Sequence, residues 1–88
     1  MNNDLFVNIG FSNVVNKSRV VCLLAPDTVP SKRLVAEARE AKKLVDCTSG
    51  RKTRTVLLLD GGVVVLCGLN GETIAARLNG VDADKEDQ

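Results

Sequence analysis

Residues 55–67 read "TVLLLDGGVVVLC", and this stretch decides the fold of the 88-residue chain. Two apolar runs of strand length flank Asp60-Gly61-Gly62, and Asp-Gly and Gly-Gly pairs accept the positive φ angles of a tight turn. The pattern predicts a β-hairpin whose strands are "TVLLLD" at 55–60 and "VVVLCGL" at 63–69. Neither run alternates apolar with polar residues, so both faces of the hairpin need a cover.

The segments around this hairpin predict further strands and a long helix. The other expected strands are residues 5–11, a short extended piece at Val14 and Val15, residues 19–25 and residues 44–48. Residues 28–45 predict a helix, because Pro30 suits a first turn and apolar residues recur at helical spacing. That apolar stripe consists of Leu34, Ala38, Ala41 and Val45.

A second, shorter helix is expected near the C-terminus. Asn70 is a residue type that caps helix N-termini, Ile74 and Leu78 would face inward, and Asn79-Gly80 closes the helix. The resulting order, β-β-α-β-β-β-α, predicts an α+β fold. Its parts are a small, mostly antiparallel sheet, one central helix and a short C-terminal helix.

The apolar hairpin also predicts self-association. One central helix and one short terminal helix leave part of a two-faced apolar sheet uncovered, and large exposed apolar patches are unusual on soluble monomers. Another copy of the chain is the simplest cover, so we expect a homo-oligomer. The alternative is a monomer whose helices are split between the two faces of the sheet.

Composition indicates one small globular domain at residues 1–81. Aromatic residues make up only 2% of the chain, so its core must be aliphatic. The segment "DADKEDQ" at 82–88 holds four acids and one Lys, which leaves 11 basic and 7 acidic residues on the domain. This segment is expected to be a disordered, solubilising tail, with an autoinhibitory mimic of an anion as the alternative. Neither a membrane span nor a signal peptide is apparent, so we expect a cytoplasmic protein.

Enzymatic chemistry is not expected. The chain has no His and no Tyr, so the common acid–base groups are reduced to carboxylates, Lys and Cys. Cys22, Cys47 and Cys67 form no CxxC pair, which argues against a metal site, and no cofactor or small-molecule substrate is implied. Cys47 has the most catalytic potential of the three, because nearby Arg51 would lower the pKa of its thiol.

Positive charge gathers in the stretch "TSGRKTRT" at 48–55, and no acidic residue occurs from 47 to 59. Arg51, Lys52 and Arg54 lie between a predicted strand and the hairpin, where Gly50 permits a sharp turn that presents them. Further candidate cations are Lys17, Arg19, Lys32 and Arg33. Duplex DNA, gripped by its phosphates, requires only Arg, Lys and backbone donors, so double-stranded DNA is the expected partner.

Other partners remain as alternatives. Proteins that bind single strands stack bases on aromatic side chains, but Phe6 and Phe11 are few and are expected near the core. A different function would be an oligomeric adaptor whose basic loop docks an acidic protein. A third alternative is binding to RNA.

Four segments of the chain resemble the RemA family, the extracellular matrix regulatory protein A of bacteria. They are "VNIGFSNVVNKSRVV" at 7–21, "PDTVPSKRLVAEARE" at 26–40, "LVDCTSGRKTRTVLLLD" at 44–60 and "ETIAARL" at 72–78. The resemblance runs in order over residues 5–78. Its motifs "NIGF.N.V...R", "P.KR...EAR" and "D.T.GR.TR" are specific.

The resemblance implies a small cytoplasmic, DNA-binding transcription regulator that forms a ring-shaped homo-oligomer, an octamer, with DNA running round the outside. It implies DNA contacts by Arg19 and by Arg51, Lys52 and Arg54 of the loop. The family more usually has Arg at position 52 and an aromatic residue at position 49, where this chain has Lys and Ser. Well-studied relatives regulate genes of the biofilm matrix and of osmotic stress. As a transcription factor, this protein is expected to act by bending promoters or by displacing a repressor.

Overall fold

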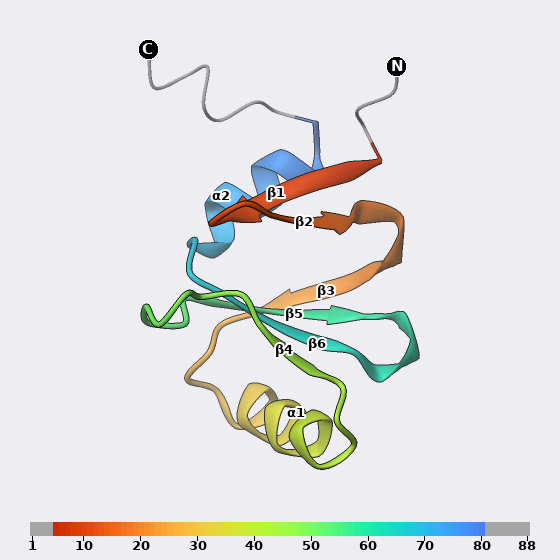
Figure 1. Ribbon diagram of the computed structural model, residues 1–88, viewed down its shortest axis with the longest axis vertical. Coiled ribbons are helices and arrows are strands. Elements are labelled where there is room, and N and C mark those ends of the chain that lie inside the picture. Colours follow the sequence, from red (N-terminus) through yellow and green to blue (C-terminus); the bar gives the residue numbers. More distant parts are fainter. Residues whose placement is uncertain (1–4, 81–88) are drawn as a thin grey trace.

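The computed structural model describes residues 5–80, so the expected acidic tail at 82–88 lies outside the described residues. The strands are β1 (Phe6–Gly10), β2 (Asn13–Asn16), β3 (Val20–Leu24), β4 (Leu44–Asp46), β5 (Thr55–Leu59) and β6 (Val64–Cys67). The helices are α1 (Val29–Glu40) and α2 (Gly71–Leu78), and the 3-10 turns are η1 (Lys17–Arg19) and η2 (Asp60–Gly62) (Figure 1). The predicted α+β class and element order are confirmed, and the extended piece at Val14 and Val15 forms β2.

The predicted hairpin forms the centre of a four-stranded sheet with the order β3-β5-β6-β4. Strands β5 and β6 are antiparallel, and Leu57 lies opposite Val65. The turn between them contains two glycines in the left-handed region, with φ angles of 78° at Gly61 and 82° at Gly62. Strand β3 joins β5 antiparallel, whereas β4 joins β6 in parallel. Strands β1 and β2 form a separate antiparallel sheet.

The two faces of the central sheet are covered by different parts of the chain (Figure 1). On one face, α1 packs Ala38 against Val56 of β5 and Val64 of β6. On the other face, β1, β2 and α2 build a second cluster around Leu57, in which Ile9 and Ile74 are at most 1% exposed. Successive side chains of β5 therefore point into two separate cores, which explains why its sequence does not alternate with polar residues.

This cover corrects the argument that the hairpin itself needs a second copy of the chain. Its side chains are nearly inaccessible within one chain: Val56, Leu57, Val64 and Cys67 are at most 1% exposed. The arrangement is the alternative in which helices are split between the two faces. The small β1-β2 sheet, which the sequence did not indicate as a cover, completes it through the inward residues Val7, Ile9 and Val15.

Helix α1 is shorter than predicted and ends at Glu40 rather than at residue 45. The amide of Lys43 donates to the carbonyl of Ala38 at 2.8 Å, and the amide of Lys42 donates to the carbonyl of Arg39 at 3.2 Å. These two bonds form a Schellman motif, in which Lys42 adopts the left-handed conformation (φ 61°) that glycine usually adopts. The sequence has no glycine at this end, and apolar residues continue at helical spacing as far as Val45. The predicted helix was therefore too long, because Val45 belongs to β4.

Helix α2 agrees with its prediction. The Asn70 side chain caps the helix by accepting a hydrogen bond from the amide of Thr73 at 2.8 Å. Ile74 is buried in the core beneath β1 and β5. Among the described residues, no helix has the length and apolar character that crossing a bilayer requires.

Candidate nucleic-acid interface

The basic loop connects β4 to β5 and is fixed at its start by Asp46. The hydroxyl and the amide of Thr48 both donate to Asp46 Oδ1, at 2.6 Å and 2.9 Å. These hydrogen bonds, the hydroxyl bond foremost, hold the pKa of the Asp46 carboxyl below its ordinary 3.8, because they stabilise the charged form. The amide of Arg51 donates to the carbonyl of Thr48 at 3.0 Å, and Gly50 turns the chain at a φ of 80°. The loop is therefore a closed turn held by its own hydrogen bonds.

The far end of the loop is tied to the central sheet. The amide of Arg54 donates to the carbonyl of Cys67 at 2.8 Å, and Thr55 Oγ1 donates to the carbonyl of Leu69 at 2.8 Å. Between the two anchors, Arg51, Lys52 and Arg54 are exposed. A rigid scaffold thus presents three cations to solvent, as the sequence predicted.

Phe11 is a further residue of this region, and the expectation that it lies near the core is wrong. It occupies the turn between β1 and β2 with a φ of 55° and is 43% exposed. The guanidinium carbon of Arg51 lies 5.3 Å from the centre of the Phe11 ring, within the range of a cation–π contact. Gly68 leaves room for the ring, because a Cβ atom there would lie 3.3 Å from Phe11 Cε2. The position of Phe11 between Gly10 and Ser12, both typical of turns, is the signal that could have placed it at a turn tip.

Arg19 lies apart from the loop within one chain. It ends η1 beside the turn that follows β5, whereas the loop precedes β5 (Figure 1). The five residues of β5 separate the two groups by roughly 16 Å, at about 3.3 Å per residue. Arg19 Nη1 lies 3.3 Å from Asp60 Oδ2, but these side chains are 64% and 56% exposed. Such an exposed ion pair is weak, so Arg19 remains open to other anions, and Lys17 lies in the same turn.

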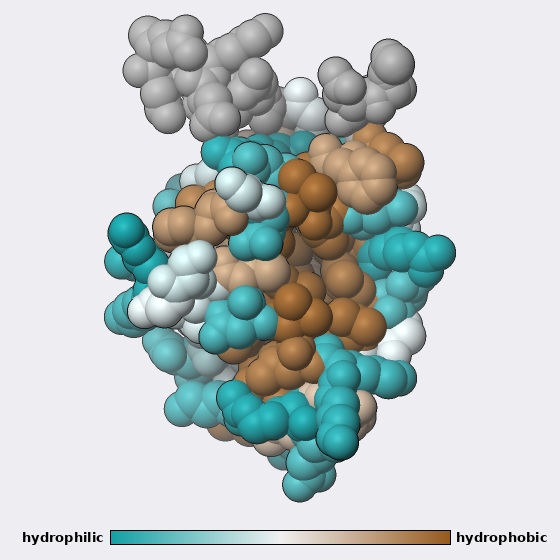
Figure 2. Space-filling model, in the orientation of Figure 1, coloured by the Kyte–Doolittle hydropathy of each residue, from teal (hydrophilic) through white to brown (hydrophobic). Residues whose placement is uncertain are grey.

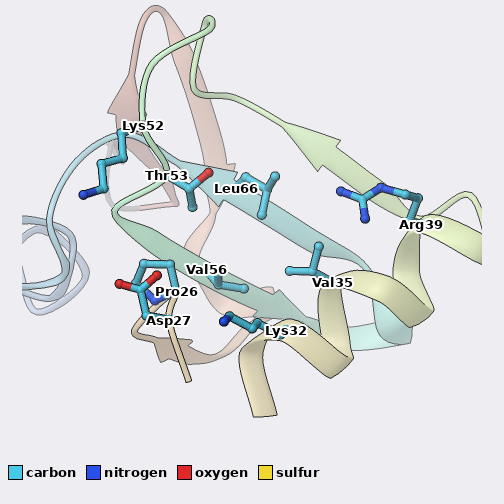
Figure 3. A pocket seen from close by; sticks show the side chains of 9 residues that line it. All are labelled: Pro26, Asp27, Lys32, Val35, Arg39, Lys52, Thr53, Val56 and Leu66. Carbon is cyan, nitrogen blue, oxygen red and sulfur yellow. The ribbon is translucent and has the colours of Figure 1, made fainter. Parts of the chain in front are cut away.

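The cations of α1 differ in their surroundings. Lys32 and Lys52 line one groove between α1, the loop and the sheet, with a volume of about 490 Å³ (Figure 3). Arg39 lines the same groove, although nothing in the sequence marked it as a candidate contact. Arg33 is exposed and lies outside the groove lining. The described part of the chain therefore carries one basic group at the loop and groove, and a second group at Lys17 and Arg19.

The thiol of Cys47 is not activated. Burial, followed by the neighbouring Cys67 and Asp46, raises the pKa of Cys47 above its ordinary 9.0. The prediction that Arg51 would lower this pKa is wrong, because the guanidinium of Arg51 lies over Phe11 and burial dominates at the thiol. Within residues 5–80, no three side chains of the types that bind metals cluster together.

Known proteins match this chain over most of its length. A family model described as RemA-like, extracellular matrix regulatory protein A-like, matches residues 6–78. A protein of Dictyoglomus thermophilum is 51% identical over 80 residues, which cover 91% of this chain and 94% of the relative. A protein of Geobacillus kaustophilus is 44% identical over 82 residues, which cover 93% and 94%. A protein of Thermosynechococcus vestitus is 49% identical over 73 residues, which cover 83% and 95%. The name of each begins "Putative regulatory protein".

Proposed function

Because this chain belongs to the RemA-like family, and its relatives carry the names of regulatory proteins, we propose that it regulates transcription by binding duplex DNA as a ring-shaped homo-oligomer. The observation that carries the proposal is the anchored loop, which holds Arg51, Lys52 and Arg54 exposed beside the central sheet. Promoters of extracellular matrix genes are the target class that the family description favours.

The chemistry of the loop favours a duplex over a single strand. Arg side chains bind phosphate through two parallel hydrogen bonds, and such contacts position a protein on DNA without reading its bases. The aromatic ring beside the loop, Phe11, has the Arg51 guanidinium over it. One covered ring is a poor platform for stacking several bases, which is the main source of affinity in single-strand binders.

Self-association is proposed from the outer strands of the sheet rather than from the hairpin. Strands β3 and β4 end the sheet order, so within the described residues their outer edges have no neighbouring strand. Val21 of β3 is 62% exposed and Val45 of β4 is 46% exposed, and an apolar open edge favours pairing with another chain. Figure 2 shows a band of apolar side chains along one face of the molecule.

The two edges differ, and this difference favours a ring. If β3 of one copy meets β4 of the next, the contact is head to tail, and head-to-tail contacts close into rings when the rotation permits. Eight copies, the number that the resemblance implies, is the proposed size. Repetition places the loop, together with Lys17 and Arg19, at regular intervals along one DNA path.

Repetition of the basic loop around the ring also raises the affinity for DNA. Bending a duplex of 20–30 base pairs costs on the order of 1–6 kcal/mol, and three or four contacts from one chain would not exceed that cost by much. Linked copies bind as one unit, so their phosphate contacts act together. We propose that the ring regulates transcription by bending the promoter or by displacing a repressor from it.

The decisive experiment is a DNA titration of Arg51→Ala combined with light scattering. At protein concentrations that saturate promoter DNA with the wild type, we expect this variant to lose retention of the DNA in a gel shift while its solution mass stays at about eight times 9.4 kDa. Lys42→Ala is the matched control, because Lys42 is exposed and lies outside both basic groups. An Arg51→Ala protein that binds promoter DNA normally refutes the site, and a monomeric wild type refutes the ring.

Competition separates the alternative partners. Unlabelled duplex DNA, duplex RNA or a polyacidic protein is added to the complex of the wild type with labelled promoter DNA. Displacement by duplex DNA at the lowest concentration supports the proposal. Stronger displacement by the acidic protein would favour the adaptor function, since the same loop would then dock a protein.

A further inference from the structure

The groove beside the loop has the features of a ligand site. Its volume of about 490 Å³ falls within the roughly 300–1,000 Å³ that small-molecule sites occupy. It lies between α1, the end of the basic loop and the sheet, so three separate parts of the chain meet there (Figure 3). The described residues that line it include three cations, Lys32, Arg39 and Lys52, and one acid, Asp27.

The cations are placed by the periodicity of α1 and by the loop. Lys32, Val35 and Arg39 follow the spacing i, i+3, i+7, which puts all three on one face of the helix. Lys32 and Arg39 are therefore roughly 10 Å apart along the helix axis. In Figure 3 the guanidinium of Arg39 points toward Leu66, while Lys52 stands on the opposite rim. Cations spread over such a length match an anion with more than one charge better than a single carboxylate.

The floor of the groove is apolar. Val35 of α1 and Leu66 of β6 are half-buried and lie between the cations (Figure 3). A DNA phosphate gains nothing from such a floor, because phosphate contacts need only charge and hydrogen-bond donors. A ligand with an apolar or flat body would cover these side chains, and Asp27 would accept hydrogen bonds from hydroxyl or amino groups on that body.

We propose that this groove binds a small organic polyphosphate of the class that nucleotides represent. Its phosphates meet Arg39 and Lys32, and its body lies on Val35 and Leu66. Lys52 belongs both to the groove and to the DNA loop, so occupation of the groove weakens DNA binding. The effect on DNA binding rests on the proposed function, whereas ligand binding itself does not.

A labelled nucleotide tests the site directly. The chain has no Trp and no Tyr, so binding is followed by the fluorescence of ATP that carries a methylanthraniloyl group on its ribose. Magnesium is left out, because the ion would neutralise the phosphates. Unlabelled ATP, inorganic triphosphate and adenosine then compete. We expect ATP to displace the probe at roughly tenfold lower concentration than either fragment. If inorganic triphosphate competes as well as ATP, the groove binds phosphate charge alone and does not recognise the organic body, which overturns the proposal.

Two charge-matched variants locate the site. Arg39→Gln removes one charge-assisted hydrogen bond and is expected to weaken ATP binding about tenfold or more. Lys42→Gln removes the same charge just beyond the end of α1, outside the groove, and is expected to leave ATP binding unchanged. Equal weakening by both variants overturns the proposal. The absence of ATP binding, together with a lower solution mass of Arg39→Gln, also overturns it and assigns the groove to contact between copies.

Titrations of promoter DNA with and without ATP separate this proposal from the proposed function. ATP is expected to raise the protein concentration needed for half-saturation of promoter DNA, and Arg39→Gln is expected to abolish that effect. If DNA binds but ATP does not, the groove proposal alone falls. If ATP binds through Arg39 but DNA does not bind, the proposed function alone falls.

Discussion

The contact between Arg51 and Phe11 provides a specific test of how the loop binds DNA. Phe11→Leu keeps an apolar side chain but removes the ring over which the guanidinium lies, 5.3 Å from its centre. A cation–π contact at an exposed site contributes about 0.5–1 kcal/mol, which here holds Arg51 in one orientation before DNA arrives. Without the ring, each Arg51 that contacts DNA must be ordered on binding, so affinity falls roughly two- to fivefold for each contacting copy.

The salt dependence of binding distinguishes this effect from a lost phosphate contact. Fluorescence anisotropy of labelled promoter DNA is measured at several salt concentrations. Phe11→Leu should lower affinity without changing the slope of log K against log salt, because the number of phosphate contacts is unchanged. Arg51→Ala should reduce that slope by about 1 for each contacting copy.

A double-mutant cycle completes the test. In the Arg51→Ala background, Phe11→Leu should have no further effect, because the two residues act through one contact. Phe6→Leu serves as the control, since Phe6 is also exposed but lies on β1 rather than beneath Arg51. Additive losses from Phe11→Leu and Arg51→Ala, or unchanged affinity in Phe11→Leu alone, would refute the reasoning.

Three further predictions concern stability, each measured by urea unfolding. Lys42→Gly should stabilise the protein by up to about 1 kcal/mol, because glycine adopts the left-handed conformation without strain, and an unchanged midpoint would contradict this. Because the pKa of Asp46 is lowered in the folded protein, its hydrogen bonds from Thr48 stabilise the fold fully above pH 3.8, and this stabilisation is lost as the pH falls through the folded-state pKa. In Asp46→Asn, the free energy of unfolding should therefore decrease less steeply at acid pH than in the wild type. Because the pKa values of Cys47 and Cys67 are raised in the folded protein, stability is lost as the pH rises past the ordinary thiol pKa of 9.0. Cys47→Ser should reduce that loss.

Local signals carried most of the correct predictions. Asp60-Gly61-Gly62 between two apolar runs predicted the hairpin, since few residue types accept the φ angles that the turn requires. Asn70 predicted the start of α2 through its hydrogen bond to a backbone amide three residues on. The end of α1 was missed, because a Schellman motif with Lys42 in place of glycine leaves no mark in the residue types.

The candidate site was predictable only in part. The cations at 51, 52 and 54 stand together in the sequence, so their loop was visible without coordinates. The ring beneath Arg51 comes from 40 positions earlier in the chain, and the groove joins Arg39 to Lys52 across a strand. Burial of Cys47 by its neighbours likewise reversed the pKa direction that nearness to Arg51 suggested.

The sequence by itself determined the elements of this protein, because turn residues, caps and apolar spacing act over a few positions. It also determined that Arg51, Lys52 and Arg54 would stand together in one loop. Only the tertiary structure decided which segments cover each face of the hairpin, where Arg19 lies relative to the loop, and which side chains meet in the groove. Those outcomes depend on contacts between residues far apart in the chain, and the free energy of burying apolar surface is indifferent to which segment supplies the cover.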